Sequence, residues 1–184
     1  VTQGQTLTAS NTLADADGLG AITYTWKEGV NVLGNGSSLL LTQAHVGKLI
    51  TVTANYTDVL GTAESVASAA TAAVANINDL PTGSVTISGT PTQGQTLTAS
   101  NTLADADGVP TLTEANYQWQ ISGDGVTGWT NFTIPANGLS ITVTAAMANL
   151  WLRNVLTFTD NGAFAETQVS EAIFIDGSVQ SAGA

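Results

Sequence analysis

TQGQTLTASNTLADADG, residues 2–18, recurs without a substitution at residues 92–108. The Tyr-x-Trp pair at Tyr24 and Trp26 returns at Tyr117 and Trp119, but 93 rather than 90 residues further on. A repeat of this period is typical of an array of small domains, and the growing offset indicates loop insertions in the second copy. The sequence therefore predicts two tandem domains, residues 1–79 and residues 80–184.

Alternation of apolar and polar residues predicts the secondary structure of each copy. In residues 5–13, QTLTASNTL, Leu7 and Ala9 share one face and threonines occupy the other. This period of two is that of strands with one buried side, and Asp-Gly and Asn-Gly turn signals separate the segments. Short strands at this spacing favour an all-β fold of antiparallel sandwiches, and the absence of Cys leaves no disulfide. We expect Trp26 and Trp119 to lie in the cores.

The charge balance restricts the partners of this chain. It carries 14 acidic residues against three basic ones, and its net charge is −11. Nucleic acids and anionic membrane surfaces repel such a protein, so neither is expected as a partner, whereas divalent cations are attracted. No apolar run approaches the ~20 residues that span a bilayer, so no membrane insertion is expected.

No motif in the chain indicates catalysis, and we predict that it is not an enzyme. It contains neither a Gly-x-Ser-x-Gly elbow nor a phosphate-cradling glycine loop. His45, the only histidine, falls in residues 41–48, LTQAHVGK. This segment predicts a single helical turn that crosses between sheets, so we interpret His45 as a surface turn residue.

The two copies differ at their start. PTGSVTISGT, residues 81–90, precedes the second copy, whereas the first begins at Val1, the position that matches Pro91. The alternation in residues 81–90 predicts a strand. The first domain is therefore expected to lack its leading strand, and we interpret the chain as a piece of a longer repeat array.

The whole pattern resembles a known family. PTGSVTISGTPTQGQTLTASNTLADADG, the Tyr-x-Trp pair and the strand ITVTANYTD at residues 50–58 resemble bacterial immunoglobulin-like repeats of giant surface adhesins and related secreted repeat proteins. The likeness covers nearly all of residues 1–110 and loosens after Trp119. It implies two tandem immunoglobulin-like sandwiches that act as structural spacers of an extracellular, cell-surface adhesin, of the kind found in biofilms. Its partners would be neighbouring repeats of the same chain, and calcium would stiffen the array.

Each repeat ends in Ala-Asp-Ala-Asp-Gly, which has two interpretations. Asp-x-Asp-Gly is a common surface turn, because Asp caps its own backbone and Gly accepts a positive φ. It can also supply half of a cation site, since calcium takes six to eight oxygen ligands from carboxylates, amides and carbonyls. The motif is not an EF-hand loop, because the twelfth position from Asp15 is Trp26 rather than Glu.

Immunoglobulin-like topology would bring further oxygen ligands to the acidic pair. In that topology the loop between the second and third strands, the loop after the sixth strand and the incoming linker lie at the same end of a domain. The resemblance thus implies a calcium site at the interdomain junction, weaker in the first copy, which has no linker in this chain. The candidate ligands are Asn78, Asp79, Asp105, Asp107 and Asp160, with Asp15, Asp17 and Asp58 as the equivalents in the first copy.

Aromatic residues of the second copy leave an alternative function open. Trp151 has the opposite parity to Leu152, Leu156 and Phe158, so it should face outward if those three are core. An outward Trp can stack on a sugar or seat a protein, which would make the second domain a module for a glycan or a host or cell-surface protein. We prefer the alternative that Trp151 packs under the insertion that contains Trp129. A third interpretation makes both domains accessory parts of a secreted enzyme.

Overall fold

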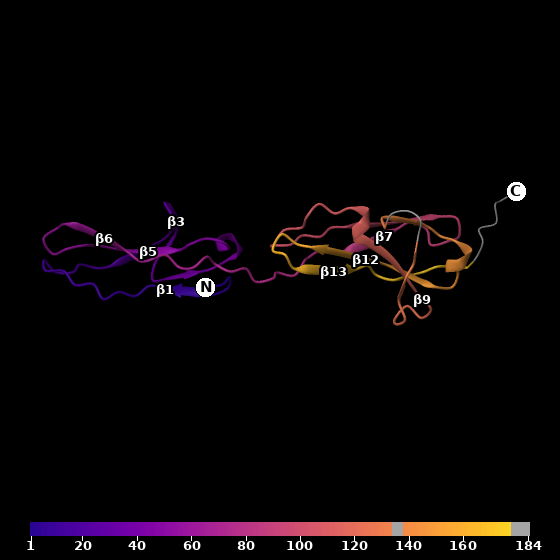
Figure 1. Ribbon diagram of the computed structural model, residues 1–184, viewed down its shortest axis with the longest axis horizontal. Coiled ribbons are helices and arrows are strands. Elements are labelled where there is room, and N and C mark those ends of the chain that lie inside the picture. Colours follow the sequence, from indigo (N-terminus) through magenta and orange to yellow (C-terminus); the bar gives the residue numbers. More distant parts are fainter. Residues whose placement is uncertain (134–137, 178–184) are drawn as a thin grey trace. The chain divides into compact units, whose positions relative to one another are not determined.

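The computed structural model describes residues 1–133 and 138–177, and this part of the chain is all-β, with antiparallel sheets and single turns of 3₁₀ helix (Figure 1). The chain divides into two compact units, Val1–Ile77 and Asn78–Ala184. No helix within the described ranges has the length and apolar character needed to cross a membrane.

Unit 1 has two sheets with a sandwich-like pattern of burial. One sheet has the strand order β1-β4 and the other the order β3-β2-β5-β6, and all these pairs are antiparallel. Its elements are β1 (Thr6–Thr8), β2 (Thr23–Glu28), β3 (Asn31–Asn35), β4 (Ser38–Leu40), η1 (Gln43–His45), β5 (Thr51–Thr57) and β6 (Ala63–Ala67).

Unit 2 repeats this plan with two additional strands, β7 and β14. Its sheets have the orders β11-β8-β7 and β10-β9-β12-β13, and β14 pairs with β12 beyond β13. Its elements are β7 (Val85–Ser88), β8 (Thr96–Asn101), η2 (Glu114–Asn116), β9 (Tyr117–Ser122), β10 (Thr130–Asn131), β11 (Ser140–Thr142), η3 (Ala145–Met147), β12 (Trp151–Thr159), β13 (Ala165–Val169) and β14 (Ile173–Phe174).

The sheet orders identify the equivalent strands. The repeated segment forms β1 in unit 1 and β8 in unit 2, and β5 corresponds to β12, because each is the central strand that pairs with the Trp-bearing strand. Strand β7 has no counterpart within residues 1–77. The repeated segment is a strand over six residues in unit 2 but over three in unit 1, shorter than the alternation in residues 5–13 predicts. The difference follows from β7, which pairs with β8 along Thr98 to Asn101.

The predicted core tryptophans are confirmed. Trp119 is fully buried and Trp26 is 4% exposed, and Leu152, Leu156 and Phe158 are buried beside Trp119 as their shared parity predicts. Sequence parity did not reveal that Asn154 is also fully buried in this row. Its side-chain amide nitrogen donates to the Gly138 carbonyl at 3.1 Å, and its backbone N–H donates to the Ser170 hydroxyl at 2.9 Å, whereas its Oδ1 has no donor among the described residues.

The helical turn predicted at residues 41–48 is confirmed as η1. Nδ1 of His45 accepts the Thr42 backbone N–H at 2.9 Å, which makes His45 part of the cap of its own turn. Unit 2 places η3 at the corresponding position, where the buried Met147 replaces the imidazole. His45 therefore has a structural role at the surface.

Identical residues are buried to different extents in the two units. Leu97 is fully buried and Ala99 is 2% exposed, whereas Leu7 and Ala9, in the same sequence context, are only half-buried. The buried cluster of unit 1 is correspondingly small and centres on Trp26, Leu41, Ile50 and Val74.

We predict that the same substitution has unequal effects in the two units. Leu97→Ala should lower the free energy of unfolding of unit 2 by about 3–5 kcal/mol, the usual cost of a cavity at a fully buried leucine. Leu7→Ala should cost about 2 kcal/mol or less, because its side chain is already partly hydrated. Calorimetric unfolding of the two variants measures the difference, and equal losses would contradict it.

Candidate metal centre

The acidic pair of unit 2 lies in a turn that begins three residues after β8. The Asp107 backbone N–H donates to Oδ1 of Asp105 at 2.8 Å, and the Gly108 N–H donates to the Asp105 carbonyl at 3.1 Å. Gly108 has φ +93°, and a Cβ there would lie 2.4 Å from the Asn161 side-chain amide nitrogen, so only glycine fits. The local backbone therefore forms the turn that Asp-x-Asp-Gly predicts. Of the two carboxylate oxygens of Asp105, this turn engages only Oδ1.

A second loop brings Asp160 to this turn. Asp160 follows β12, and its Oδ1 accepts the Phe164 N–H at 2.9 Å, which closes the β12–β13 hairpin. The Asn161 N–H donates to the Gly108 carbonyl at 3.2 Å and ties the two loops together.

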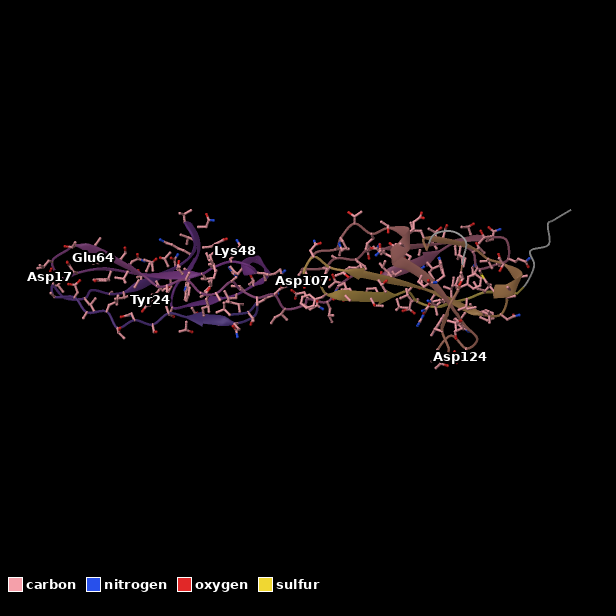
Figure 2. The ribbon with its side chains drawn as sticks, in the orientation of Figure 1. Asp17, Tyr24, Lys48, Glu64, Asp107 and Asp124 are labelled. Atoms are coloured by element: carbon pink, nitrogen blue, oxygen red, sulfur yellow. The ribbon has the colours of Figure 1, made fainter. Side chains whose placement is uncertain are left out.

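The three carboxylates form one group. Asp105, Asp107 and Asp160 each offer an oxygen, and these oxygens lie within 4.8 Å of one another. Asp107 and Asp160 are buried, with 6% and 5% exposure, and Asp105 is half-buried. Figure 2 labels Asp107 in this loop. Among residues 1–133 and 138–177 it is the only such group of three, and it could hold a metal ion.

The first residues of unit 2 complete the surroundings of the group. The Asp79 backbone N–H donates to Oδ2 of Asp107 at 2.8 Å, and the Asn78 amide donates to Oε1 of the buried Glu166 at 2.8 Å. Asp79 thus acts through its backbone, and its carboxylate is not a member of the three-residue group. Glu166 lies across the β12–β13 hairpin, opposite Phe158.

Three buried oxygens at this place have no hydrogen-bond donor within the described part of the chain. They are Oδ2 of Asp105, Oδ2 of Asp160 and Oδ1 of Asn78. A buried acceptor without a partner costs about 1–3 kcal/mol, and more when it is charged. Orphaned oxygens of this kind are uncommon in folded proteins and require a physical explanation.

Repulsion between the negative carboxylates adds to the free-energy cost of this arrangement. Two like charges 4.8 Å apart repel by about 3.5 kcal/mol at an effective dielectric constant of about 20. Arg153 is the only basic residue between residues 78 and 184. Its guanidinium donates to Gln120 Oε1 at 2.9 Å and lies 4.1 Å from the centre of the Trp129 ring, so it is engaged elsewhere. No basic side chain of unit 2 therefore neutralises the group.

In the equivalent turn of unit 1, both carboxylate oxygens of the first aspartate accept hydrogen bonds. The Asp17 N–H donates to Oδ1 of Asp15 at 2.8 Å, as in unit 2, but Oδ2 of Asp15 accepts the Tyr56 hydroxyl at 2.9 Å. Tyr56 corresponds to Phe158 in unit 2, which has no hydroxyl. The missing hydroxyl is the direct reason why Oδ2 of Asp105 has no donor. Asp15 and Asp17, both predicted as weaker ligands, do not form a three-carboxylate group with any neighbour in unit 1.

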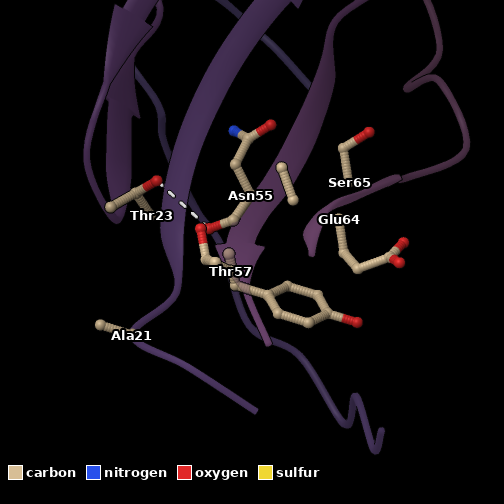
Figure 3. Close-up of a pocket in the computed structure, with 8 residues that line it drawn as sticks. Ala21, Thr23, Asn55, Thr57, Glu64 and Ser65 are labelled. Carbon is tan, nitrogen blue, oxygen red and sulfur yellow. Dashed lines mark hydrogen bonds between the residues drawn. The ribbon is translucent and has the colours of Figure 1, made fainter. Parts of the chain in front are cut away.

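The counterpart of Glu166 in unit 1, Glu64, differs from it in burial. Glu64 is exposed and lines an open depression beside β5 and β6, together with Asn55, Thr57 and Ser65 (Figure 3). Glu64 is the only charged residue of this lining. The depression therefore lacks the convergent carboxylates that distinguish unit 2.

The aromatic residues proposed as ligand contacts have partners within unit 2. The Trp151 ring packs edge-on against Phe174 with 5.4 Å between ring centres, and Gly125 approaches it so closely that a Cβ would lie 2.6 Å away. The Trp129 indole N–H donates to the Val126 carbonyl at 3.3 Å. The preferred interpretation, that Trp151 packs under the insertion, agrees with these contacts.

Comparison with known proteins does not extend this description. No protein-family model matches the chain, and no curated protein matches its sequence.

We predict that the closed turn of unit 1 changes the titration of Tyr56. Its hydrogen bond to Asp15, with burial and nearby carboxylates, raises the pKa of Tyr56 above the ordinary value of 10.0. The stability that this bond contributes should be complete below pH 10 and lost as the pH rises through the raised pKa, because the phenolate can no longer donate. In an ultraviolet titration, the wild type should show a phenolate step above pH 10 that the Tyr56→Phe variant lacks.

Asp15→Asn is the control for this titration. It keeps an acceptor but removes the charge, so it should move the Tyr56 step back towards pH 10. A missing step at or below pH 10 in Tyr56→Phe would show that the bond to Asp15 does not govern Tyr56.

Proposed function

We propose that the chain is a non-catalytic structural spacer of a bacterial extracellular adhesin, built of tandem immunoglobulin-like sandwiches, and that unit 2 binds calcium. The exact 17-residue repeat, the acidic composition and the resemblance of residues 1–110 to adhesin repeats support the spacer role. The repeated sheet order of the two units is in agreement with it. No feature of the described residues favours a reaction mechanism.

One observation carries the calcium proposal. Three buried oxygens from three separate segments, at Asn78, Asp105 and Asp160, have no donor in the described chain. A bound cation would satisfy all three and would neutralise the repulsion among the carboxylates. The Asp107 carboxylate would complete the negative charge of the site.

The donor set favours calcium over other ions. Zinc prefers Cys and His ligands, and residues 78–184 contain neither. Magnesium demands near-octahedral geometry and usually keeps several waters, whereas calcium accepts six to eight oxygens in a flexible arrangement. Carboxylates, a side-chain amide oxygen and main-chain carbonyls from loops form a site of the calcium kind.

Calcium at this site would act mechanically. Asn78 and Asp79 directly follow Ile77, the last residue of unit 1. An ion held by Asn78, Asp105 and Asp160 fixes the first residues of unit 2 to two of its own loops. Without the ion, carboxylate repulsion loosens this segment, so extracellular calcium would control the stiffness of the connection along the chain.

We predict that calcium stabilises unit 2. At 100 times its dissociation constant it should add about 2.7 kcal/mol to the free energy of unfolding, which corresponds to about 10 °C in the Tm of a unit of this size. Isothermal titration should give one site per chain. Small-angle scattering should show a narrower distribution of chain dimensions with calcium than with a chelator.

Substitutions can separate metal binding from folding. Asp160→Asn keeps Oδ1 for the Phe164 N–H but removes the charge, so it should fold as well as wild type and lose the calcium effect. Asp58→Asn, at the equivalent position of unit 1, where Oδ1 accepts the Thr62 N–H, should leave the effect intact. If the Tm and the scattering are the same with calcium and with chelator in wild type, the calcium proposal is wrong.

We also predict that one added hydroxyl group weakens calcium binding by unit 2. Phe158→Tyr would place a donor where Tyr56 donates to Asp15, and this hydroxyl would occupy Oδ2 of Asp105. Calcium affinity should fall at least about tenfold, because one ligand oxygen is engaged. The stability of the metal-free protein should not fall. Unchanged affinity in titration of Phe158→Tyr would contradict the proposed role of Asp105.

A further inference from the structure

The loop that joins β12 to β13 contains Asn161, an exposed asparagine that is directly followed by Gly162. An asparagine in this context can lose its side-chain amide without an enzyme, because glycine has no Cβ that shields its backbone nitrogen from the preceding side chain. Within the described part of the chain, neither the Asn161 side chain nor the Gly162 N–H forms a hydrogen bond. No hydrogen bond therefore has to open before these two groups meet.

The corresponding loop of unit 1 places its glycine differently. The two loops have equal length, since in each the backbone N–H of the aspartate after the central strand donates to the carbonyl four residues further on, at 2.9 Å. In unit 1 Gly61 takes the positive φ of the loop, +95°. In unit 2 Ala163 takes it, at +70°, although an alanine is strained there, and φ of Gly162 is not positive. The glycine of unit 2 thus lies one residue before the position whose backbone requires it, and directly after Asn161.

An Asn-Gly pair of unit 1 is held by hydrogen bonds instead. Asn35 is the last residue of β3, and the N–H of the following Gly36 donates to the Tyr24 carbonyl at 2.9 Å. Oδ1 of Asn35 accepts the Thr25 hydroxyl at 3.1 Å. Both bonds must open before the Gly36 nitrogen can reach the Asn35 side chain. The chain therefore offers a protected pair that can be compared with Asn161.

Asn161 lies beside the three-aspartate group. It directly follows Asp160, and its backbone N–H donates to the Gly108 carbonyl at 3.2 Å, in the turn that contains Asp105 and Asp107. Its side-chain amide nitrogen lies 2.4 Å from the position that a Cβ on Gly108 would take. A carboxylate in place of this amide would add a fourth negative charge next to three that already repel one another.

We propose that Asn161 is a site of spontaneous deamidation, and that the modification adds a carboxylate to the surroundings of the three-aspartate group. The Gly162 backbone nitrogen attacks Cγ of Asn161 in an intramolecular step that needs only the correct approach of two adjacent groups. A C–N bond forms, and the side-chain amide leaves as ammonia with the proton of the Gly162 N–H. Solvent water then opens the succinimide ring and yields aspartate or isoaspartate at position 161. One water is consumed and one ammonia released, without oxidation or reduction, and the reaction does not depend on calcium.

Peptide mapping of the full chain tests the proposal, because trypsin separates the three Asn-Gly pairs of the sequence. Cleavage occurs after Lys27, Lys48 and Arg153. Asn35 then lies in residues 28–48 and Asn161 in residues 154–184, whereas the third pair, which begins outside the described residues, lies in residues 49–153. The folded chain is incubated in mildly alkaline buffer with a chelator before digestion. Conversion at Asn161 should be at least about tenfold faster than at Asn35, whose hydrogen bonds must open first.

Two controls separate the effect of structure from that of local sequence. In denaturant the hydrogen bonds of both pairs are lost, so conversion at Asn35 and at Asn161 should agree within about threefold. Gly162→Ala adds a Cβ beside the attacking nitrogen at a position without a positive φ, so the variant should fold like wild type. Its conversion at Asn161 should be at least about tenfold slower, because the added group hinders the approach.

Asn161→Asp reproduces one product and measures its effect on the acidic group. In chelator at low salt its Tm should lie about 3–5 °C below that of wild type, because the added charge repels the three carboxylates. Added salt should reduce this difference, since it screens the repulsion.

Two results would overturn the proposal. Conversion at Asn161 that is no faster than at Asn35 in the folded chain would show that the β12–β13 loop does not favour the reaction. Equal Tm values for Asn161→Asp and wild type at low salt would show that a carboxylate at position 161 does not act on the three-aspartate group.

Discussion

The antiparallel pairing of β7 with β8 is the interaction on which most of unit 2 depends. It covers one edge of the repeated strand and buries Leu97 and Ala99 beneath it. It continues past β7 to a bridge in which the Thr82 and Ala104 backbones exchange hydrogen bonds of 2.7 and 3.0 Å. Thr82 lies three residues after Asp79, and Ala104 immediately precedes Asp105. The same ladder therefore completes the core and brings the segment of Asn78 and Asp79 to the acidic turn.

The acidic group shows how a small change decides between a turn whose oxygens have donors and a turn that could hold a metal ion. Both units contain the same Asp-x-Asp-Gly turn with the same hydrogen bond across it. In unit 1 the Tyr56 hydroxyl satisfies the remaining oxygen of Asp15, so the turn is complete without an added ion. In unit 2 Phe158 has no hydroxyl, so Oδ2 of Asp105 has no donor. Oδ2 of the buried Asp160 is a second oxygen without a donor. The cost of these orphaned, mutually repelling oxygens is what a cation would offset.

Much of the fold was predictable because it depends on local patterns. Period-two alternation indicated the all-β class, the buried tryptophans and the buried parity of Leu152, Leu156 and Phe158. The short segment around His45 indicated a single helical turn. The backbone role of Asp79 could not be predicted, since its acidic side chain gives no sign that its N–H is the group that bonds Asp107. Asn154 occupies the same core row although it is polar, and only its donor groups have partners inside the unit.

The sequence by itself determined the class of fold, the repeat and the oxygen-rich composition of the acidic turn, since these follow from residue types and their spacing. It could not determine that two identical stretches would differ in strand length, burial and chemistry. Only the tertiary structure decided those properties, because they depend on groups that are distant in sequence. Strand β7 covers one copy of the repeated segment and not the other, and a hydroxyl reaches one carboxylate and not its equivalent. Burial and hydrogen bonding are properties of these neighbours, so equal sequences acquire unequal roles.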